Sequence, residues 1–297
     1  MKKLLILSLL FLTIGGTINA QEQKLAPYIK IGQFNEDISA LSSTIEQALK
    51  TADFEILGAY NPGNNSNLKI IAFTRSDLIN TVSKVKDRGA LAAILKVGFV
   101  TEGEKITVSY VNPNYIFNAF LRKEMPNYAT ELNSISNDVK NALATVGTES
   151  TGFGGGVYAE KLWKYHYKMM MPYFSDPVTL NTYTSFEEGR QIIEANLANN
   201  KSDTKLVYKL DLSDKNTVVY GVALLNTEDG EPYFLPKIGI ENIAAMPYEI
   251  ILQGNKVTML HGKYRLALSW PELSMGTFMG IMSTPGDIKD MLKSITE

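Results

Sequence analysis

The residues best suited to chemistry are two histidines and a cluster of methionines late in the chain. His166 precedes Met170 by four positions, and nine of the eleven methionines lie at or after position 169. Thioether and imidazole groups are ligands that Cu(I) prefers, and a spacing of four would place them on one face of a helix. The same spacing is typical of apolar stripes that pack on a core: Trp163, His166, Met170 and Phe174 in one segment, Met275, Met279 and Met282 in another. We therefore favour packing for both sets and keep a Met/His protein that binds Cu(I) as an alternative.

Aromatic residues concentrate between Tyr158 and Tyr183, a stretch that holds seven of them. Amphipathic rings line many ligand clefts because they offer stacking area with a polar tip, and they equally join packed surfaces. Because this stretch connects the two halves of the chain, we expect packing between the halves. A ligand between them would contact Trp163, His166, Tyr167 and Met170, and would be Cu(I) or a small aromatic or glycan-like molecule.

Enzyme signatures are incomplete in this sequence. Ser83 and Ser202 each begin a Ser-x-x-Lys pattern, but neither the Ser-Asp-Asn nor the Lys-Thr-Gly companion of acyl-serine enzymes occurs. Residues 152–156 are rich in glycine, but the stretch before them is polar, whereas phosphate loops follow an apolar strand. We therefore predict a binding protein without a cofactor or metal. A hydrolase whose site is assembled only in three dimensions is the second alternative.

The composition is that of an ordinary globular protein. Of 297 residues, 45% are hydrophobic and 20% are charged, with 29 Lys and Arg against 31 Asp and Glu. The net charge of −2 provides no excess of cations to neutralise phosphates, which argues against nucleic acid as a partner. Because the chain has no cysteine, disulfides, thiolate zinc sites and thiol nucleophiles are excluded.

The N-terminus has the parts of a secretory signal peptide. Lys2 and Lys3 form a basic region, residues 4–14 are apolar, and small residues lead to a cleavage site after Ala20. The apolar core is shorter than the roughly 20 residues that a membrane-spanning helix needs. A lipoprotein would need a cysteine at the cleavage point. We therefore predict an exported, periplasmic or extracellular protein that neither spans the membrane nor carries this lipid anchor.

An internal repeat organises the remaining residues. Residues 92–108 and 244–259 both read Ala-Ala, an apolar strand, a glycine-containing turn and Lys-apolar-Thr-apolar, which predicts two β-hairpins. Apolar runs of buried-strand length precede them at 68–73 and 218–225. Each half also begins with a strand and an amphipathic helix and closes with another helix.

With this order of elements, the apolar side of each strand is most simply buried in an antiparallel sheet with helices packed on one face. We predict an α+β fold of two tandem domains, each with a sheet of four to five strands. The boundaries are a signal peptide at 1–20, domains at 21–146 and 176–297, and a connection at 147–175. That connection is predicted to be a glycine-rich linker followed by an aromatic helix over residues 157–174.

The first half resembles domain-of-unknown-function family 302 over residues 28–118. The resemblance rests on the strand–helix start, the helical insert at 76–93 and the sequence Tyr110-Val111-Asn112-Pro113 after the second hairpin strand. It implies a compact α+β domain with a four-stranded sheet. It assigns no catalytic residues, because the family is uncharacterised. The second half has His261-Gly262-Lys263-Tyr264 instead and is interpreted as a diverged copy.

The connecting residues 164–174 are similar to a segment found in exported envelope proteins that carry this domain. Together these features predict an exported, non-catalytic binding or interaction protein of the bacterial envelope. Its partner is an unknown small molecule or another envelope protein.

Overall fold

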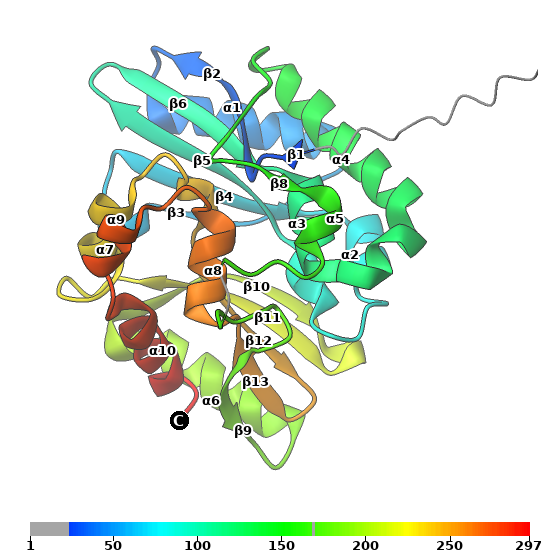
Figure 1. Ribbon diagram of the computed structural model, residues 1–297, viewed down its shortest axis with the longest axis vertical. Coiled ribbons are helices and arrows are strands. Elements are labelled where there is room, and N and C mark those ends of the chain that lie inside the picture. Colours follow the sequence, from blue (N-terminus) through cyan, green and yellow to red (C-terminus); the bar gives the residue numbers. More distant parts are fainter. Residues whose placement is uncertain (1–23, 168–169) are drawn as a thin grey trace, which may run out of the picture.

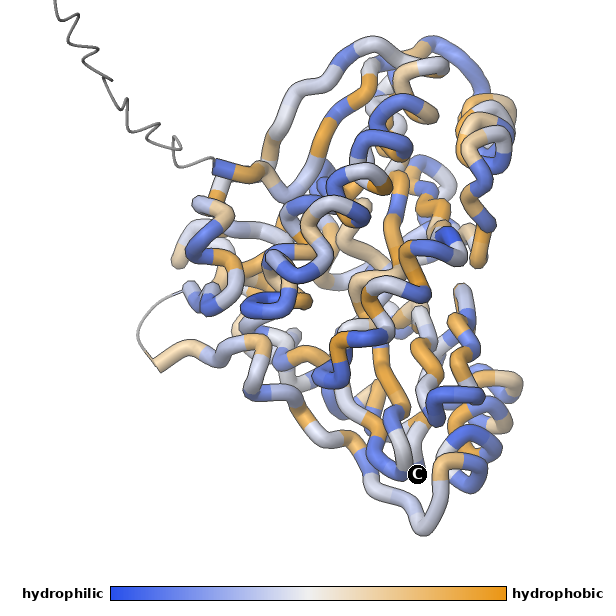
Figure 2. The backbone as a smooth tube through the Cα atoms, turned by 90° about the vertical axis from the view of Figure 1, so that its right-hand side faces the viewer, coloured by the Kyte–Doolittle hydropathy of each residue, from blue (hydrophilic) through white to orange (hydrophobic). Residues whose placement is uncertain are grey.

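The computed structural model describes residues 24–167 and 170–297, so the predicted signal peptide lies outside the described residues. The chain combines helices with two large antiparallel sheets, one in each half, which confirms the α+β fold class (Figure 1). Figure 2 shows the most apolar stretches running through the interior of both halves. In the part of the chain described, no helix has the length and apolar character needed to cross a membrane.

The first half forms a six-stranded sheet in the order β3-β4-β5-β6-β2-β7. Its strands are β2 (Tyr28–Phe34), β3 (Glu55–Tyr60), β4 (Leu68–Thr74), β5 (Leu95–Glu102), β6 (Lys105–Val111) and β7 (Thr151–Phe153). Its helices are α1 (Ile38–Thr51), α2 (Ser76–Val82), α3 (Pro113–Leu121) and α4 (Ala129–Ala144). Helices α1 and α4 contact each other, and α1 also contacts β3 and β4. Apart from Ser42 and Ser136, the buried faces of these two helices are apolar, as their periodicity predicts.

The second half forms a five-stranded sheet in the order β10-β11-β12-β13-β9. Its strands are β9 (Val178–Thr182), β10 (Thr204–Leu212), β11 (Thr217–Leu224), β12 (Tyr248–Gln253) and β13 (Lys256–Met259). Its helices are α6 (Phe186–Ala198), α7 (Glu231–Ile238), α8 (Gly262–Ser269), α9 (Met275–Met279) and α10 (Thr284–Ser294). This strand order repeats β3-β4-β5-β6-β2 of the first half position by position.

Matching irregularities support the same correspondence. One extra residue interrupts the pairing of each outer strand: Leu57 between β3 and β4, and Val207 between β10 and β11. A second bulge falls at Ile31 in β2 and at Leu180 in β9. Because a bulge bends its strand locally, the two sheets share their local bends as well as their strand order.

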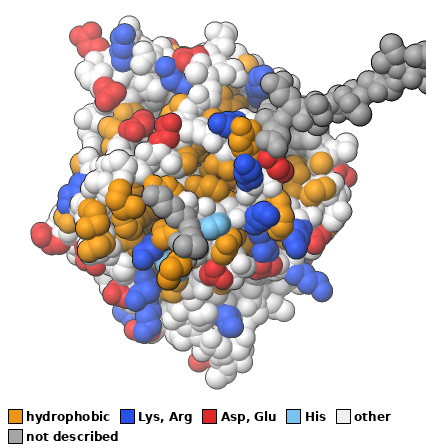
Figure 3. All heavy atoms as spheres, viewed as in Figure 1, with side chains coloured by type: hydrophobic (Ala, Val, Ile, Leu, Met, Phe, Trp, Pro, Cys, Tyr) orange, Lys and Arg blue, Asp and Glu red, His pale blue; other side chains and the backbone are white. Residues whose placement is uncertain are grey.

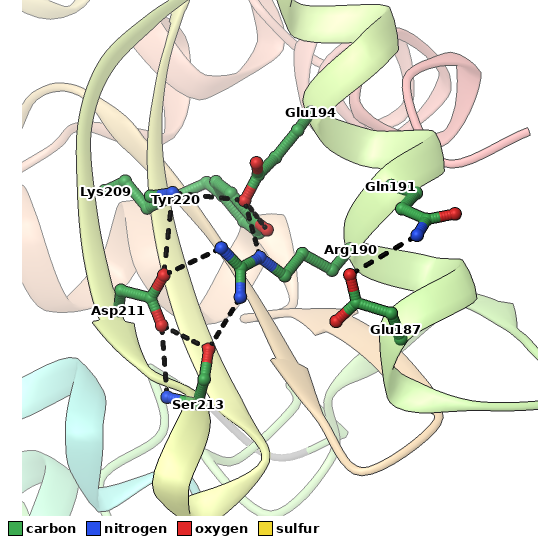
Figure 4. Close-up of polar contacts among 8 residues, drawn as sticks. All are labelled: Glu187, Arg190, Gln191, Glu194, Lys209, Asp211, Ser213 and Tyr220. Carbon is green, nitrogen blue, oxygen red and sulfur yellow. Dashed lines mark hydrogen bonds and ion pairs between the residues drawn. The ribbon is translucent and has the colours of Figure 1, made fainter.

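A polar network joins helix α6 to the second sheet (Figure 4). Arg190 of α6 donates to Glu194 at 3.1 Å and to Ser213 Oγ at 2.9 Å, and its other terminal nitrogen lies 3.2 Å from Asp211. Lys209 and Tyr220 extend from the sheet to the same Glu194 carboxylate. These charged groups are about one-third exposed, so the network orients α6 more than it stabilises the fold.

The two halves pack closely where the edge strands β3 and β10 meet. A Cβ atom added to Gly58 would lie 2.2 Å from the Val207 carbonyl oxygen, so only glycine fits there. Lys96 of β5 forms an ion pair with Glu249 of β12 across this interface. Glu249 also accepts from Tyr208 at 3.0 Å and lies 3.5 Å from Arg265.

The predicted aromatic helix over 157–174 is wrong. The segment contains strand β8 (Val157–Tyr158), which pairs with β1 (Lys24–Leu25), and a single helical turn, α5 (Ala159–Leu162). Aromatic residues are weak helix formers, and Met170 has a φ of 68°, which a right-handed helix does not accept. The preceding glycine-rich stretch is also more than a linker, because β7 within it pairs with β2 as the sixth strand. The domain boundaries themselves stay a prediction.

Candidate functional site

The segment of residues 159–175, here called the strap, crosses the surface where the two halves meet. Leu162 and Phe174 are buried and fix its described parts to the core. Tyr165 donates its hydroxyl hydrogen bond to the Ala267 carbonyl at the end of α8, at 3.0 Å. Burial raises the pKa of Tyr165 to about 12, so this hydroxyl keeps its proton and its role as donor.

The structure separates the four residues that the sequence predicts as ligand contacts. Trp163, His166 and Tyr167 are half-buried, whereas the Met170 side chain is 95% exposed. The His166 ring lies 4.4 Å from the ring of Tyr173. Because α5 ends at Leu162, His166 and Met170 do not face each other on a helix, and the geometric basis for pairing them as metal ligands is lost.

Tyr167 lines a hollow of about 220 Å³ between the strap, α8 and α9, here called the apolar hollow. Most of its walls are aromatic or aliphatic: Tyr167 and Met171 from the strap, Leu266, Ala267 and Trp270 from α8 and the residue after it, and Leu273, Met275 and Phe278 from the α9 region. Lys263 and Ser274 are the polar lining residues. Pockets of this kind bind ligands mainly by apolar contact and ring stacking.

The polar groups beside the apolar hollow already have structural roles. The Ser274 hydroxyl caps α9 by accepting from the Thr277 backbone nitrogen at 3.0 Å. Trp270 is 4% exposed, and its indole nitrogen donates to the Gly239 carbonyl at 3.3 Å. The described lining of the hollow therefore offers few groups for acid–base chemistry.

The predicted core stripe of Met275, Met279 and Met282 is wrong. These side chains are 52%, 58% and 59% exposed, respectively. Helix α9 is too short to present a continuous buried face, and the residue that fixes this region in the core is Ile281, which is 1% exposed. Figure 3 shows hydrophobic side chains gathered around α9, while several Lys and Arg side chains lie on the opposite side of the same face.

Trp163 lines a second hollow, to which the strap contributes residues 163, 164 and 173–175. This hollow, of about 330 Å³, lies between the strap and the residues that follow α3. Its lining combines Trp163, Tyr173 and Phe174 with the cations Arg122, Lys123 and Lys164. We call it the cationic hollow.

Sequence reasoning missed the contribution of the second half to the apolar hollow. Trp270, Leu273 and Phe278 follow α8 in a stretch without a recognisable motif. The available signal was weak: Trp270 is one of only two tryptophans, and Phe278 stands among exposed methionines.

Comparison with known proteins gave few matches. No family model and no curated protein matches the chain. Among solved structures, the chain matches the "Crystal structure of uncharacterized conserved protein DUF302 from Bacillus stearothermophilus" with 11% sequence identity and a TM-score of 0.31. The match covers 41% of this chain and 96% of that protein. That protein is described as DUF302, which is the family that residues 28–118 resemble.

Proposed function

We propose that the protein is an exported, non-catalytic binding protein of the bacterial envelope, and that its ligand is a small, mainly apolar molecule. The apolar hollow carries this proposal. A cavity of about 150 Å³ lined by apolar side chains is large enough for benzene, so about 220 Å³ has room for a ring with one or two substituents.

The residue types in the walls support a site that adapts to different ligands. The strap contributes Tyr167 and Met171, and α9 contributes Met275 and Phe278, whereas Trp270 forms a buried and hydrogen-bonded wall. Methionine side chains adjust their shape to different apolar ligands because they are unbranched and polarisable. Lys263 adds one positive charge to the lining.

Binding is tested by NMR with the methionine methyl groups labelled with ¹³C, using toluene and p-cresol as probes. We expect the Met171 and Met275 signals to shift on titration, while Met125 and Met246, which are buried elsewhere, stay unchanged. Leu273→Trp fills the hollow and should abolish the shifts. Leu206→Trp, at an exposed apolar position outside the lining, is the matched control. Equal shifts in both variants, or none in the unmodified protein, would refute the proposal.

Export rests on the predicted signal peptide and is tested separately. We expect the full chain, expressed in a bacterium, to yield an extracytoplasmic product whose mass corresponds to a start at Gln21. A cytosolic product that retains Met1 would contradict this part of the proposal.

A further inference from the structure

The cationic hollow has an excess of positive charge in its lining. Arg122, Lys123 and Lys164 line it, together with one carboxylate, Glu124. The Glu124 carboxylate accepts a hydrogen bond from Asn127 at 3.0 Å. Lys123 and Lys164 lie 5.2 Å and 4.8 Å from the centre of the Trp163 ring. Ring contacts of this kind hold an ammonium group in place without neutralising it.

Arg122 of this lining shares a single carboxylate with Arg88, which lies outside the lining. The guanidinium carbons of Arg88 and Arg122 lie 4.3 Å and 4.8 Å from the centre of the Phe174 ring. Asp87 accepts from Arg88 Nε at 2.8 Å and also from Arg122 Nη2. One carboxylate for two guanidinium groups leaves one positive charge at this position.

The same arginines have unused hydrogen-bond donors. Arg88 Nη1 and Arg122 Nε are buried and have no hydrogen-bond partner among the described residues. Arg88 itself is only 4% exposed. Buried donors without partners are rare in native proteins and call for an explanation.

The backbone at both arginines is strained. Arg122 has φ 53° and ψ −123°, and Arg88 has φ 56° and ψ 26°, conformations in which glycine is the usual residue. Such positions are costly for a residue with a side chain and cluster where a site is preorganised. Arg122 follows the last residue of α3, where a glycine would end the helix at less cost. The chain therefore retains a guanidinium at a position that favours glycine.

We propose that the cationic hollow is a binding site for a small aromatic anion. The anionic group, a carboxylate or a phosphate, lies among Arg122, Lys123 and Lys164, and the ring lies against the exposed aromatic wall that Tyr173 provides. Charge-assisted hydrogen bonds to the anion and ring stacking both favour this class of ligand. The site is separate from the apolar hollow and does not depend on the function proposed for it.

Calorimetric titration of the purified protein with four probes tests the proposal: benzoate, phenyl phosphate, inorganic phosphate and benzyl alcohol. We expect benzoate or phenyl phosphate to bind, whichever has the fitting anionic group. Benzyl alcohol and inorganic phosphate should bind at least tenfold more weakly, because each lacks one half of the recognised chemistry. Equal binding of inorganic phosphate and phenyl phosphate would overturn the aromatic part of the proposal. Equal binding of benzyl alcohol would overturn the anionic part.

Variants assign the binding to this hollow. Combined Lys123→Gln and Lys164→Gln should weaken binding at least tenfold, whereas Lys205→Gln, at an exposed position of the second half, should not. Arg122→Gly should also weaken binding while the protein stays folded by circular dichroism, because glycine suits that backbone. Leu273→Trp in the apolar hollow should leave anion binding unchanged. Absence of binding by all four probes, or binding that is equal in the lysine variant and the unmodified protein, would refute the proposal.

Discussion

Glu231 belongs to the second half, and its carboxylate accepts hydrogen bonds from the first half. It is fully buried at the start of α7. It accepts from the Gly63 backbone nitrogen at 2.8 Å and from the Tyr60 hydroxyl at 3.1 Å, and also from Leu224 at 3.2 Å. Burial raises the pKa of Glu231 to about 7, although the backbone hydrogen bonds from Gly63 and Leu224 act in the opposite direction.

This pKa makes the stability of the protein depend on pH. The folded state holds the Glu231 proton up to higher pH than the unfolded chain, whose value is 4.5. The contribution of this group is therefore complete below about pH 4.5 and is lost as the pH rises through about 7. We expect the midpoint of urea unfolding to fall between about pH 5 and pH 8, and Glu231→Gln to remove most of that fall.

The matched control for this prediction is Glu36→Gln, because Glu36 is an exposed glutamate. The control should retain the fall of the unmodified protein. A Glu231→Gln variant with the same pH dependence as the control would assign the effect to another group.

Single buried charges were the least predictable residues of the interface. Lys96 stands alone in an apolar strand of the sequence, and nothing in the pattern identifies its partner Glu249. The Arg265 guanidinium completes the cluster by donating to the carbonyls of Ala245 and Pro247 at 2.6 Å and 2.7 Å. Such pairs depend on how the two sheets are docked, and a local sequence pattern carries no information about docking.

At the scale of elements, the sequence predicted the hairpins and helices that have a regular local pattern. The hairpins at 92–108 and 244–259 and the α1 and α4 helices form because alternating or helical apolar patterns agree with their turns and caps. Ser185 caps α6 by accepting from the Glu188 nitrogen at 3.1 Å. The helix predicted for the strap is wrong because the spacing of the aromatic residues also suits a helix. In the structure the strap instead contacts α8 and α3. Tertiary contacts overrode the local pattern there.

The contact of strand β5 with the other half gives a prediction at this scale. A Cβ atom at Gly98 would lie 2.7 Å from Ile243 Cγ2 and 2.9 Å from the Ala244 backbone nitrogen. We expect Gly98→Ala to destabilise the protein by about 1–3 kcal/mol in urea unfolding, because one of the two crowded atoms belongs to the backbone. Gly286→Ala in α10 is the matched control, since its Cβ would meet nothing within 4 Å. It should be neutral or stabilise by up to about 1 kcal/mol. Equal effects of the two substitutions would show that the halves separate more easily than this contact implies.

At the scale of the whole molecule, the connection between the halves matters less than the surface they share. Two buried tyrosines of the first half donate to carbonyls in the last turn of α8: Tyr28 to Ser269 at 3.0 Å and Tyr115 to Leu268 at 2.9 Å. Burial raises the pKa of both hydroxyls well above the ordinary value, so they remain donors at neutral pH. With the Glu249 and Glu231 contacts, these bonds join the halves at points distributed across the interface.

We therefore expect that the strap can be cut without separating the halves. A protease site inserted after Met170 would be accessible, because that side chain is 95% exposed. We expect the cleaved protein to elute as a single species of unchanged size in native buffer at micromolar concentration, and to give two fragments in denaturant. Because folding then requires two chains to meet, its melting temperature should rise with protein concentration, whereas that of the intact chain should not. Fragments that separate in native buffer would show that the strap, and not the shared surface of the two sheets, holds the molecule together.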